Sequence, residues 1–113
     1  MHELGIVMHI AESVIEVMKE EELTEVQKIV LQVGELSSVI PRYLEDCYPA
    51  AVDGTVLEKT ELEIEIIPAI AKCKDCAEVY NLVPNKRICP KCGADHWELL
   101  SGTEFNLKEI IAC

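Results

Sequence analysis

Residues 73–93 read CKDCAEVYNLVPNKRICPKCG. This stretch contains two Cys-x-x-Cys pairs separated by twelve residues, Cys73/Cys76 and Cys89/Cys92. Two thiolates three residues apart on a tight turn can share one ion, and a hairpin brings the second pair opposite the first. Gly93 follows the second pair and permits the left-handed turn that such a knuckle needs. The spacing predicts a tetrahedral four-thiolate site in a compact ribbon, with no open position for a substrate.

The sequence context favours a bound metal over disulfide bonds. Six cysteines in 113 residues would suggest three disulfides in a secreted miniprotein. The first twenty residues, however, carry glutamates within an amphipathic pattern, so we expect no signal peptide and a cytoplasmic location. Zinc is the predicted metal. A one-electron carrier usually surrounds its iron with a small aromatic core, whereas most of this chain lies outside the knuckles and forms a different structure. A rubredoxin-like iron site, which shares the Cys-Pro-x-Cys-Gly sequence, is the alternative.

The composition indicates a small acidic globular protein. Ten basic and twenty-one acidic residues give a formal net charge of −11, and half of the residues are apolar. This charge repels phosphate backbones, so nucleic acid is not an expected partner. No apolar run approaches the roughly 20 residues of a membrane span. Residues 69–100 hold five basic and four acidic side chains, so the negative charge lies almost entirely outside the ribbon.

The remaining residues predict an α+β fold: two helices on a small three-stranded sheet, with a zinc ribbon of two Cys-x-x-Cys knuckles inserted near the end. The first helix is expected over 3–20, with an apolar stripe at helical spacing. The stripe consists of Leu4, Val7, Ala11, Val14 or Ile15, and Met18. The second helix is expected over 41–53, because Pro41 suits a first helical turn and Asp53-Gly54 ends it. Pro49 lies inside this helix and should kink or split it.

Strands are expected at 26–33, 61–67 and 103–112, where apolar residues alternate with polar ones. In the first of them, Ile29, Leu31 and Val33 share one face. We therefore divide the chain into an α/β domain of residues 1–68 plus 101–113 and a zinc-ribbon domain of residues 69–100.

Other candidate groups are interpreted structurally. The carboxylates of Glu61, Glu63 and Glu65 form a ladder that is typical of a solvated strand face. Cys47 is expected to fill an apolar position of the second helix, and Cys113 to be exposed. No Ser-His-Asp or Cys-His arrangement and no glycine-rich phosphate loop is present, so the sequence does not indicate an enzyme.

The N-terminus, Met1-His2-Glu3, places three nitrogens in one chelating array. The Met1 amine and the His2 amide close a five-membered ring on a metal, and the His2 amide and imidazole Nδ1 close a six-membered ring. Cu²⁺ and Ni²⁺ can deprotonate such an amide because they gain a square-planar nitrogen field. The Glu3 amide, a water or another group would fill the fourth position. Taken alone this array is weak evidence for a metal site, because a histidine at the second position can be incidental.

Several short motifs together resemble the HypA/HybF family, the nickel-insertion accessory proteins of NiFe-hydrogenase maturation. In chain order they are Met1-His2-Glu3-Leu4, Val33-Gly34-Glu35-Leu36-Ser37, Gly54-Thr55 followed by Glu58, Glu61-Leu62, the two Cys-x-x-Cys pairs and Ser101-Gly102-Thr103-Glu104. The likeness runs almost from end to end, and the combination is specific. It implies a cytoplasmic nickel metallochaperone, with a small nickel-binding α/β domain formed by 1–68 plus 101–113 and a structural zinc ribbon.

The resemblance also implies roles for individual residues. His2 is the nickel ligand, with the Met1 amine and the backbone near Glu3, and the Glu3 side chain tunes the nickel site or contacts a partner. The zinc ligands are Cys73, Cys76, Cys89 and Cys92. Nickel is thus transferred cargo, and zinc is structural. The implied partners are a nickel-handling GTPase, the hydrogenase large subunit and, in some relatives, urease accessory proteins; the chain is expected to be a monomer or a homodimer.

Two other functions stay open. A zinc-ribbon adaptor without a nickel role would bind zinc and be indifferent to substitution of His2. A rubredoxin-like electron carrier would be red and show a one-electron couple. Among the remaining histidines, His9 lies two helical turns beyond His2 and is expected on the surface. His96, four residues after Cys92, is expected near the zinc and could exchange with a thiolate.

Overall fold

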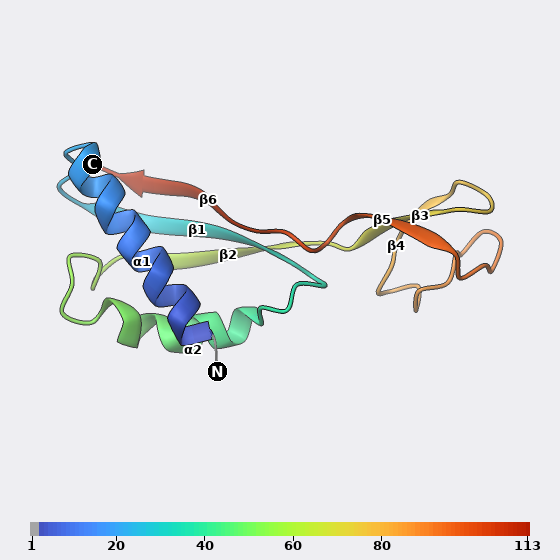
Figure 1. The fold of residues 1–113 in the computed structure, drawn as a ribbon, viewed down its shortest axis with the longest axis horizontal. Helices are drawn as coiled ribbons and strands as arrows, with labels where there is room; N and C mark the ends of the chain where they lie inside the picture. The colour runs from blue at the N-terminus through green and yellow to red at the C-terminus, as the bar shows by residue number, and fades with distance from the viewer. Residues whose placement is uncertain (1–2) are drawn as a thin grey trace. The chain divides into compact units, whose positions relative to one another are not determined.

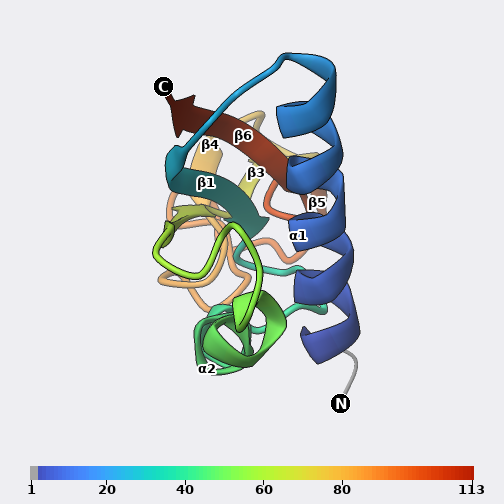
Figure 2. The ribbon, with the colours of Figure 1, turned by 90° about the vertical axis from the view of Figure 1, so that its left-hand side faces the viewer.

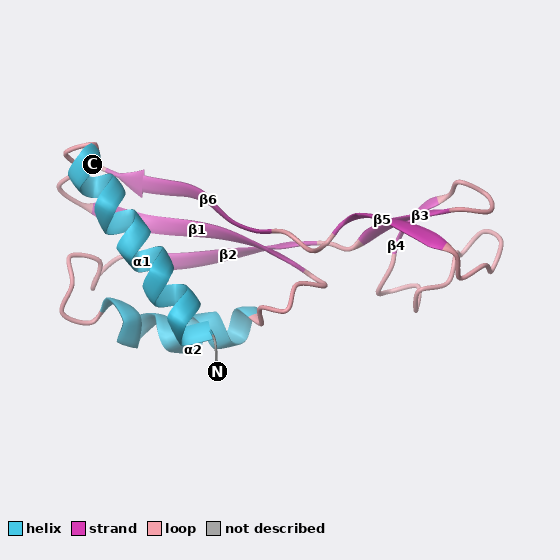
Figure 3. Cartoon of the chain, viewed as in Figure 1, coloured by secondary structure: helices cyan, strands magenta, loops and turns pink. Residues whose placement is uncertain are grey.

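The computed structural model describes residues 3–113, which form two helices and six strands. Met1 and His2 lie outside the described residues. The elements, shown in Figures 1 and 3, are α1 (Glu3–Glu20), β1 (Val26–Gly34), α2 (Pro41–Val52), β2 (Glu61–Ile67), β3 (Ile70–Cys73), β4 (Val79–Asn81), β5 (Trp97–Ser101) and β6 (Phe105–Ala112). Neither helix of residues 3–113 combines the length and the apolar character that a membrane crossing requires.

Backbone contacts divide the chain into two compact units. The first unit comprises the described residues up to Gln32, together with 39–65 and 106–113. The ribbon unit comprises 33–38 and 66–105. This contact-based division groups 33–38, 66–68 and 101–105 with the ribbon, whereas the sequence suggested a ribbon domain of 69–100. The physical reason is that the backbone of 34–36 is hydrogen-bonded to Ile67, Gly102 and Glu104.

The first unit contains a three-stranded sheet in the order β2-β1-β6, so β2 and β6 are its outer strands. Along β1 and β2 the side-chain contacts advance together, from Lys28–Glu63 (3.2 Å) to Gln32–Glu65 (3.4 Å), so these two strands are parallel. Parallel strands need a crossover connection, and α2 lies within it. β6 runs antiparallel to β1, because its C-terminal end is bonded beside the start of β1. The predicted α+β class is confirmed.

Helix α1 crosses one face of this sheet and contacts α2 (Figures 1 and 2). The predicted stripe is correct from the second turn onward, since Val7, Ala11, Val14 and Met18 are buried. Its first member is wrong: Leu4 is 39% exposed, and the Glu3 side chain is buried instead, at 3% exposure. The buried positions of α1 are spaced by three or four residues. The position four residues before Val7 is therefore buried, which is Glu3, and Leu4 faces solvent.

Strand β1 supplies the centre of the core. Ile29, Leu31 and Val33 are buried, as their alternation predicts, and Val30 on the opposite face is buried as well. Helix α2 is continuous from Pro41 to Val52, so of the two expected effects of Pro49, a kink or a split, the split does not occur. Pro49 is on the exposed side of the helix, where the carbonyl group deprived of its amide partner can face water.

The ribbon unit contains a second antiparallel sheet in the order β4-β3-β5. Ala71 on β3 lies opposite Tyr80 on β4 and Leu99 on β5, and Cys73 lies opposite Trp97. These residues share the buried face. The cluster that they build consists of Ala69, Ala71, Cys73, Tyr80, Leu82 and Cys89, with Leu36, Cys76, Ala94, Trp97 and Leu99 packed against it.

At the base of the ribbon, three chain segments approach more closely than side chains would allow. The Gly34 amide donates to the Glu104 carbonyl (2.6 Å), and the Leu36 amide donates to the Gly102 carbonyl (2.7 Å). The Glu35 carboxylate accepts the Ala69 amide (3.0 Å). A Cβ atom on Gly34 would overlap the carbonyl group of Gly102 and lie 2.7 Å from the Glu104 nitrogen. Glycine at position 34 is therefore a steric requirement of this crossing.

Substituting Gly34 tests this crossing. Gly34→Ala forces a methyl group into backbone, so we expect a loss of about 1–3 kcal/mol in the free energy of unfolding of the ribbon unit. Urea titration followed by the fluorescence of Trp97, the single tryptophan, measures it. Gly5→Ala is the matched control, because an added Cβ there has nothing within 4 Å. Equal midpoints for Gly34→Ala and wild type would contradict the steric account.

The Tyr48 hydroxyl tests the packing of α2. It donates to the Thr60 carbonyl (2.9 Å), and burial raises the pKa of Tyr48 to about 12. A raised pKa means that this group's contribution to stability is complete below pH of about 10 and is lost as the pH rises through about 12. We expect Tyr48→Phe to be less stable at pH 7 by about 1 kcal/mol and to lose less stability than wild type on going alkaline. Urea titrations across that pH range measure both, and parallel profiles would refute the assignment.

Candidate metal centre

The two Cys-x-x-Cys pairs lie on two turns of matching geometry. The first turn follows β3, and the second lies between β4 and β5. In each turn the carbonyl of the first cysteine accepts a hydrogen bond from the amide four residues later. The amide of the same cysteine donates to the carbonyl five residues later. The bonds are Ala77–Cys73 (2.9 Å) and Cys73–Glu78 (2.8 Å) in the first turn, and Gly93–Cys89 (2.9 Å) and Cys89–Ala94 (2.9 Å) in the second.

The four predicted cysteines are brought together. Their Sγ atoms all lie within 4.8 Å of one another. The distances across the two pairs are 3.6 Å for Cys73–Cys92 and 3.5 Å for Cys76–Cys89. A tetrahedral ion with metal–sulfur bonds of about 2.3 Å places its sulfurs about 3.8 Å apart. The spacing of the thiols therefore fits one tetrahedral ion.

Both turns need a left-handed residue directly after the second cysteine. Gly93 has φ +76°, as the sequence predicts, and Ala77 holds the same place in the first turn with φ +66°. An L-residue in this region costs roughly 1–2 kcal/mol that glycine does not. The first turn is thus strained where the second is relaxed, and only the comparison of the two turns reveals it.

The short separations between the sulfurs affect the ionisation of individual thiols. Burial acts to raise the pKa of Cys89, but the amides of Cys92 and Lys91 and two neighbouring thiols lower it to about 7. The Ala94 amide favours the Cys92 thiolate, yet the other three sulfurs and burial raise the pKa of Cys92 to about 12. The neighbouring sulfurs thus oppose ionisation of Cys92 and favour that of Cys89. A divalent cation would remove that repulsion.

A buried hydroxyl group accompanies the sulfurs. Tyr80 belongs to the same cluster and is 5% exposed, and its Oη has no hydrogen-bond partner among the described residues. Burial and the charges of the four cysteine sulfurs raise the pKa of Tyr80. A phenol kept protonated beside sulfur anions suits a site whose ligands are thiolates.

The histidines remain outside this group. His96 is exposed and contacts two carboxylates, Asp75 (3.4 Å) and Asp95 (3.6 Å). The ligand-forming cluster among residues 3–113 contains the four cysteines and no histidine. His9 is exposed on α1, where the sequence placed it.

The predicted nickel ligands, Met1 and His2, lie outside the described residues. Glu3, the third member of that motif, begins α1, and its side chain is buried in the first unit. A buried carboxylate in a first helical turn complements the positive end of the helix dipole. Sequence periodicity missed this burial, because it assigned the inward position to the apolar neighbour. Of the other cysteines, Cys113 is exposed as predicted, and Cys47 is only half-buried.

The two turns supply a paired test. We expect Ala77→Gly to raise the free energy of unfolding of the metal-loaded protein by about 0.5–1 kcal/mol and Gly93→Ala to lower it by about 1–2 kcal/mol. No atom lies within 4 Å of a Cβ at position 93, so the effect there is one of backbone conformation. Urea unfolding followed by Trp97 fluorescence measures both variants. Changes of the same sign would refute the equivalence of the turns.

Comparison with known proteins matches residues 1–112 to the family described as "Hydrogenase/urease nickel incorporation, metallochaperone, hypA". Proteins named hydrogenase maturation factor HypA are similar over almost the whole length. The one from Trichormus variabilis is 38% identical, covering 97% of this chain and 94% of its own. The one from Streptomyces avermitilis is 35% identical, with coverage of 97% and 86%.

Solved structures share the fold. The solution structure of the Ni metallochaperone HypA from Helicobacter pylori matches with a TM-score of 0.64 and 21% identity, covering 99% of this chain and 97% of that one. A second solution structure, of a HypA protein, matches with a TM-score of 0.70 and 22% identity, with coverage of 100% and 97%. The match of the family over residues 1–112 and the full-length relatives show that this chain belongs to the HypA family of metallochaperones for nickel incorporation.

Proposed function

We propose that this protein binds Ni²⁺ at its N-terminus and delivers it for the maturation of NiFe-hydrogenase, without catalysing a reaction itself. The observation that carries the proposal is the match to the nickel-incorporation family over residues 1–112, which includes both the Met1-His2-Glu3 motif and the four cysteines. The family description also mentions urease, so urease maturation is a second use of the same cargo. The cytoplasm is the compartment in which we place this activity.

The ribbon would hold a structural Zn²⁺ through Cys73, Cys76, Cys89 and Cys92. Zinc suits the site because it accepts four thiolates in tetrahedral geometry and does not change its oxidation state. The sulfur separations of 3.5 and 3.6 Å support this assignment. Bound zinc supplies the positive charge that lets all four thiols ionise, and it leaves no position open for a substrate.

Nickel would be held by a different kind of ligand. The Met1 amine, the His2 amide and the His2 imidazole Nδ1 offer three nitrogens in adjacent chelate rings, and the Glu3 amide is a candidate for the fourth position. Such an array selects metals that gain from a square-planar nitrogen field, Ni²⁺ and Cu²⁺, over Zn²⁺. The buried Glu3 side chain places a negative charge in the first turn of α1, next to this array.

Transfer would proceed by ligand exchange. A square-planar ion has open axial faces, so ligands of a recipient can bind before those of the donor leave. The partners that we propose are a nickel-handling GTPase, which supplies the ion, and the hydrogenase large subunit, which receives it; urease accessory proteins are the equivalent partners for urease. The formal net charge of −11 favours protein partners over nucleic acid.

A nickel titration of tag-free, zinc-loaded protein tests the N-terminal site. We expect one Ni²⁺ per chain in wild type, with a visible ligand-field band, and loss of both in His2→Gln while zinc stays bound. Glutamine is preferred to alanine at position 2, because a large side chain there disfavours removal of Met1. Calorimetry and absorption spectra are the measurements.

His9→Gln is the matched control, since His9 is an exposed histidine on α1. Equal nickel binding by His2→Gln and wild type would contradict the proposal and favour a zinc-ribbon adaptor. A red protein with a one-electron couple would favour the electron carrier instead.

A further inference from the structure

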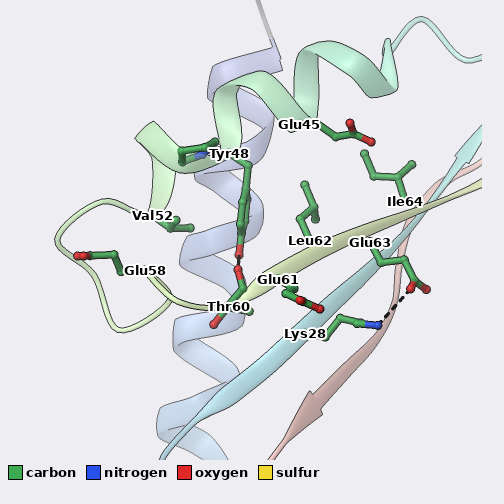
Figure 4. Close-up of a pocket in the computed structure, with 11 residues that line it drawn as sticks. Lys28, Glu45, Tyr48, Val52, Glu58, Thr60, Glu61, Leu62, Glu63 and Ile64 are labelled. Atoms are coloured by element: carbon green, nitrogen blue, oxygen red, sulfur yellow. Dashed lines mark hydrogen bonds and ion pairs between the residues drawn. The ribbon is translucent and has the colours of Figure 1, made fainter.

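Strand β2 borders a hollow of about 740 Å³ in the first unit (Figure 4). Its walls come from α2, from the segment after α2 and from β2 itself. The lining residues that matter are Glu45, Tyr48, Glu61, Leu62, Glu63 and Ile64. All of them belong to the first unit. Its lining contains no residue of the N-terminal motif and none of the four cysteines of the ribbon.

The hollow runs around the outer edge of β2. In Figure 4, Leu62 and Ile64 point toward α2, whereas Glu63 points to the opposite side, toward Lys28 of β1. Successive side chains of a strand lie on opposite faces, so a hollow lined by all of 61–64 must pass over the strand's edge. That edge is available for pairing, because β2 is the outer strand in the order β2-β1-β6.

The apolar wall of the hollow is held in place. Tyr48 is buried, and its hydroxyl donates to the Thr60 carbonyl (2.9 Å). The Thr60 hydroxyl in turn donates to the Val26 carbonyl (2.6 Å), which ties the wall to β1. A surface fixed in this way loses little conformational entropy when an apolar side chain packs on it.

The rim of the hollow is acidic. Lys28 is the only basic residue of the lining, and it is paired with Glu63 (3.2 Å). Glu58 accepts the Gly54 amide (2.9 Å). Within residues 3–113, neither Glu45 nor Glu61 has an ion-pair partner. Two unpaired carboxylates therefore flank an apolar wall, one on α2 and one on β2.

We propose that the edge of β2 binds an extended segment of a protein partner in which lysine or arginine alternates with apolar residues. Paired as a further strand, its apolar side chains would lie beside Leu62 and Ile64, and its basic side chains beside Glu61 and Glu63. Main-chain hydrogen bonds provide affinity in this mode, and alternate side chains provide specificity. The alternating acidic and apolar residues Glu-Leu-Glu-Ile of 61–64 thus match a strand that alternates basic and apolar residues.

A second copy of β2 is a poor occupant of the same edge. Pairing Glu61-Leu62-Glu63 with itself would bring like charges opposite one another, and this is destabilising. The acidic ladder therefore discourages self-association through β2 while leaving the edge open to a basic strand.

The test uses the full-length, zinc-loaded protein without nickel and a fluorescent hexapeptide that alternates lysine and valine. We expect saturable binding by fluorescence anisotropy, with amide chemical-shift changes centred on 61–64. A peptide of three lysines followed by three valines has the same charge and composition, and we expect it to bind at least about tenfold more weakly. Alternate amides of a paired strand point toward its neighbour. N-methylation of the lysines only, or of the valines only, should therefore abolish binding in one case and not in the other.

Two double variants separate this site from general charge attraction. Glu61→Gln/Glu63→Gln should raise the dissociation constant about tenfold, because the two carboxylates that lie beside the basic side chains of the bound strand are lost. Glu12→Gln/Glu16→Gln removes the same charge from exposed positions of α1 and should leave it within about twofold. Equal effects of the two double variants, equal binding of the two peptides, or shift changes away from β2 would overturn the proposal. Nickel is absent throughout, so failure here leaves the proposed nickel site unaffected.

Discussion

The ribbon unit depends on four sulfur atoms that lie within 4.8 Å of one another. Its buried cluster has six residues, two of which are alanines and two of which are the cysteines Cys73 and Cys89. Such a cluster buries little apolar surface to offset the entropy of ordering the chain. The thiols repel one another when they ionise, as the raised pKa of Cys92 indicates. The four cysteines are placed so that they could hold one metal ion, and binding of such an ion would stabilise this unit.

The family motifs that contain no ligand acquire a physical meaning at the base of the ribbon. Gly34 and Gly102 belong to two motifs far apart in the chain, and their backbones approach more closely than any Cβ would allow. Glu35 and Glu104 accept backbone amides of Ala69 and Gly102 at 3.0 and 2.7 Å. These residues act through the backbone geometry of the crossing and not through metal chemistry.

Sequence periodicity and spacing predicted both helices, the three strands of the larger sheet and the four cysteines. Those features are encoded by the local order of residues, which helix and strand geometry convert directly into faces. The burial of Glu3 in place of Leu4 was missed, because an apolar side chain is the default choice for a buried position. The continuity of α2 through Pro49 depends on which side of the helix faces solvent, and this is set by tertiary packing.

Two further features needed coordinates. Alanine is not a residue type that indicates a left-handed turn, so the strain at Ala77 is recognised only when its φ is compared with that of Gly93. The hollow along β2 arises from residues of α2, of a loop and of two strands, so no single stretch of sequence contains it. The proposed nickel motif is the opposite case, since Met1-His2-Glu3 is recognisable in the sequence and its first two residues lie outside the described structure.

The central claim is that zinc and nickel occupy sites of different chemistry, sulfur in the ribbon and nitrogen at the N-terminus. X-ray absorption spectra at the zinc and nickel edges of one doubly loaded sample test it directly. We predict four sulfurs at about 2.3 Å around zinc, and around nickel a planar shell of nitrogen and oxygen without sulfur. Sulfur in the nickel shell, or nickel replacing zinc among the four cysteines, would contradict the account.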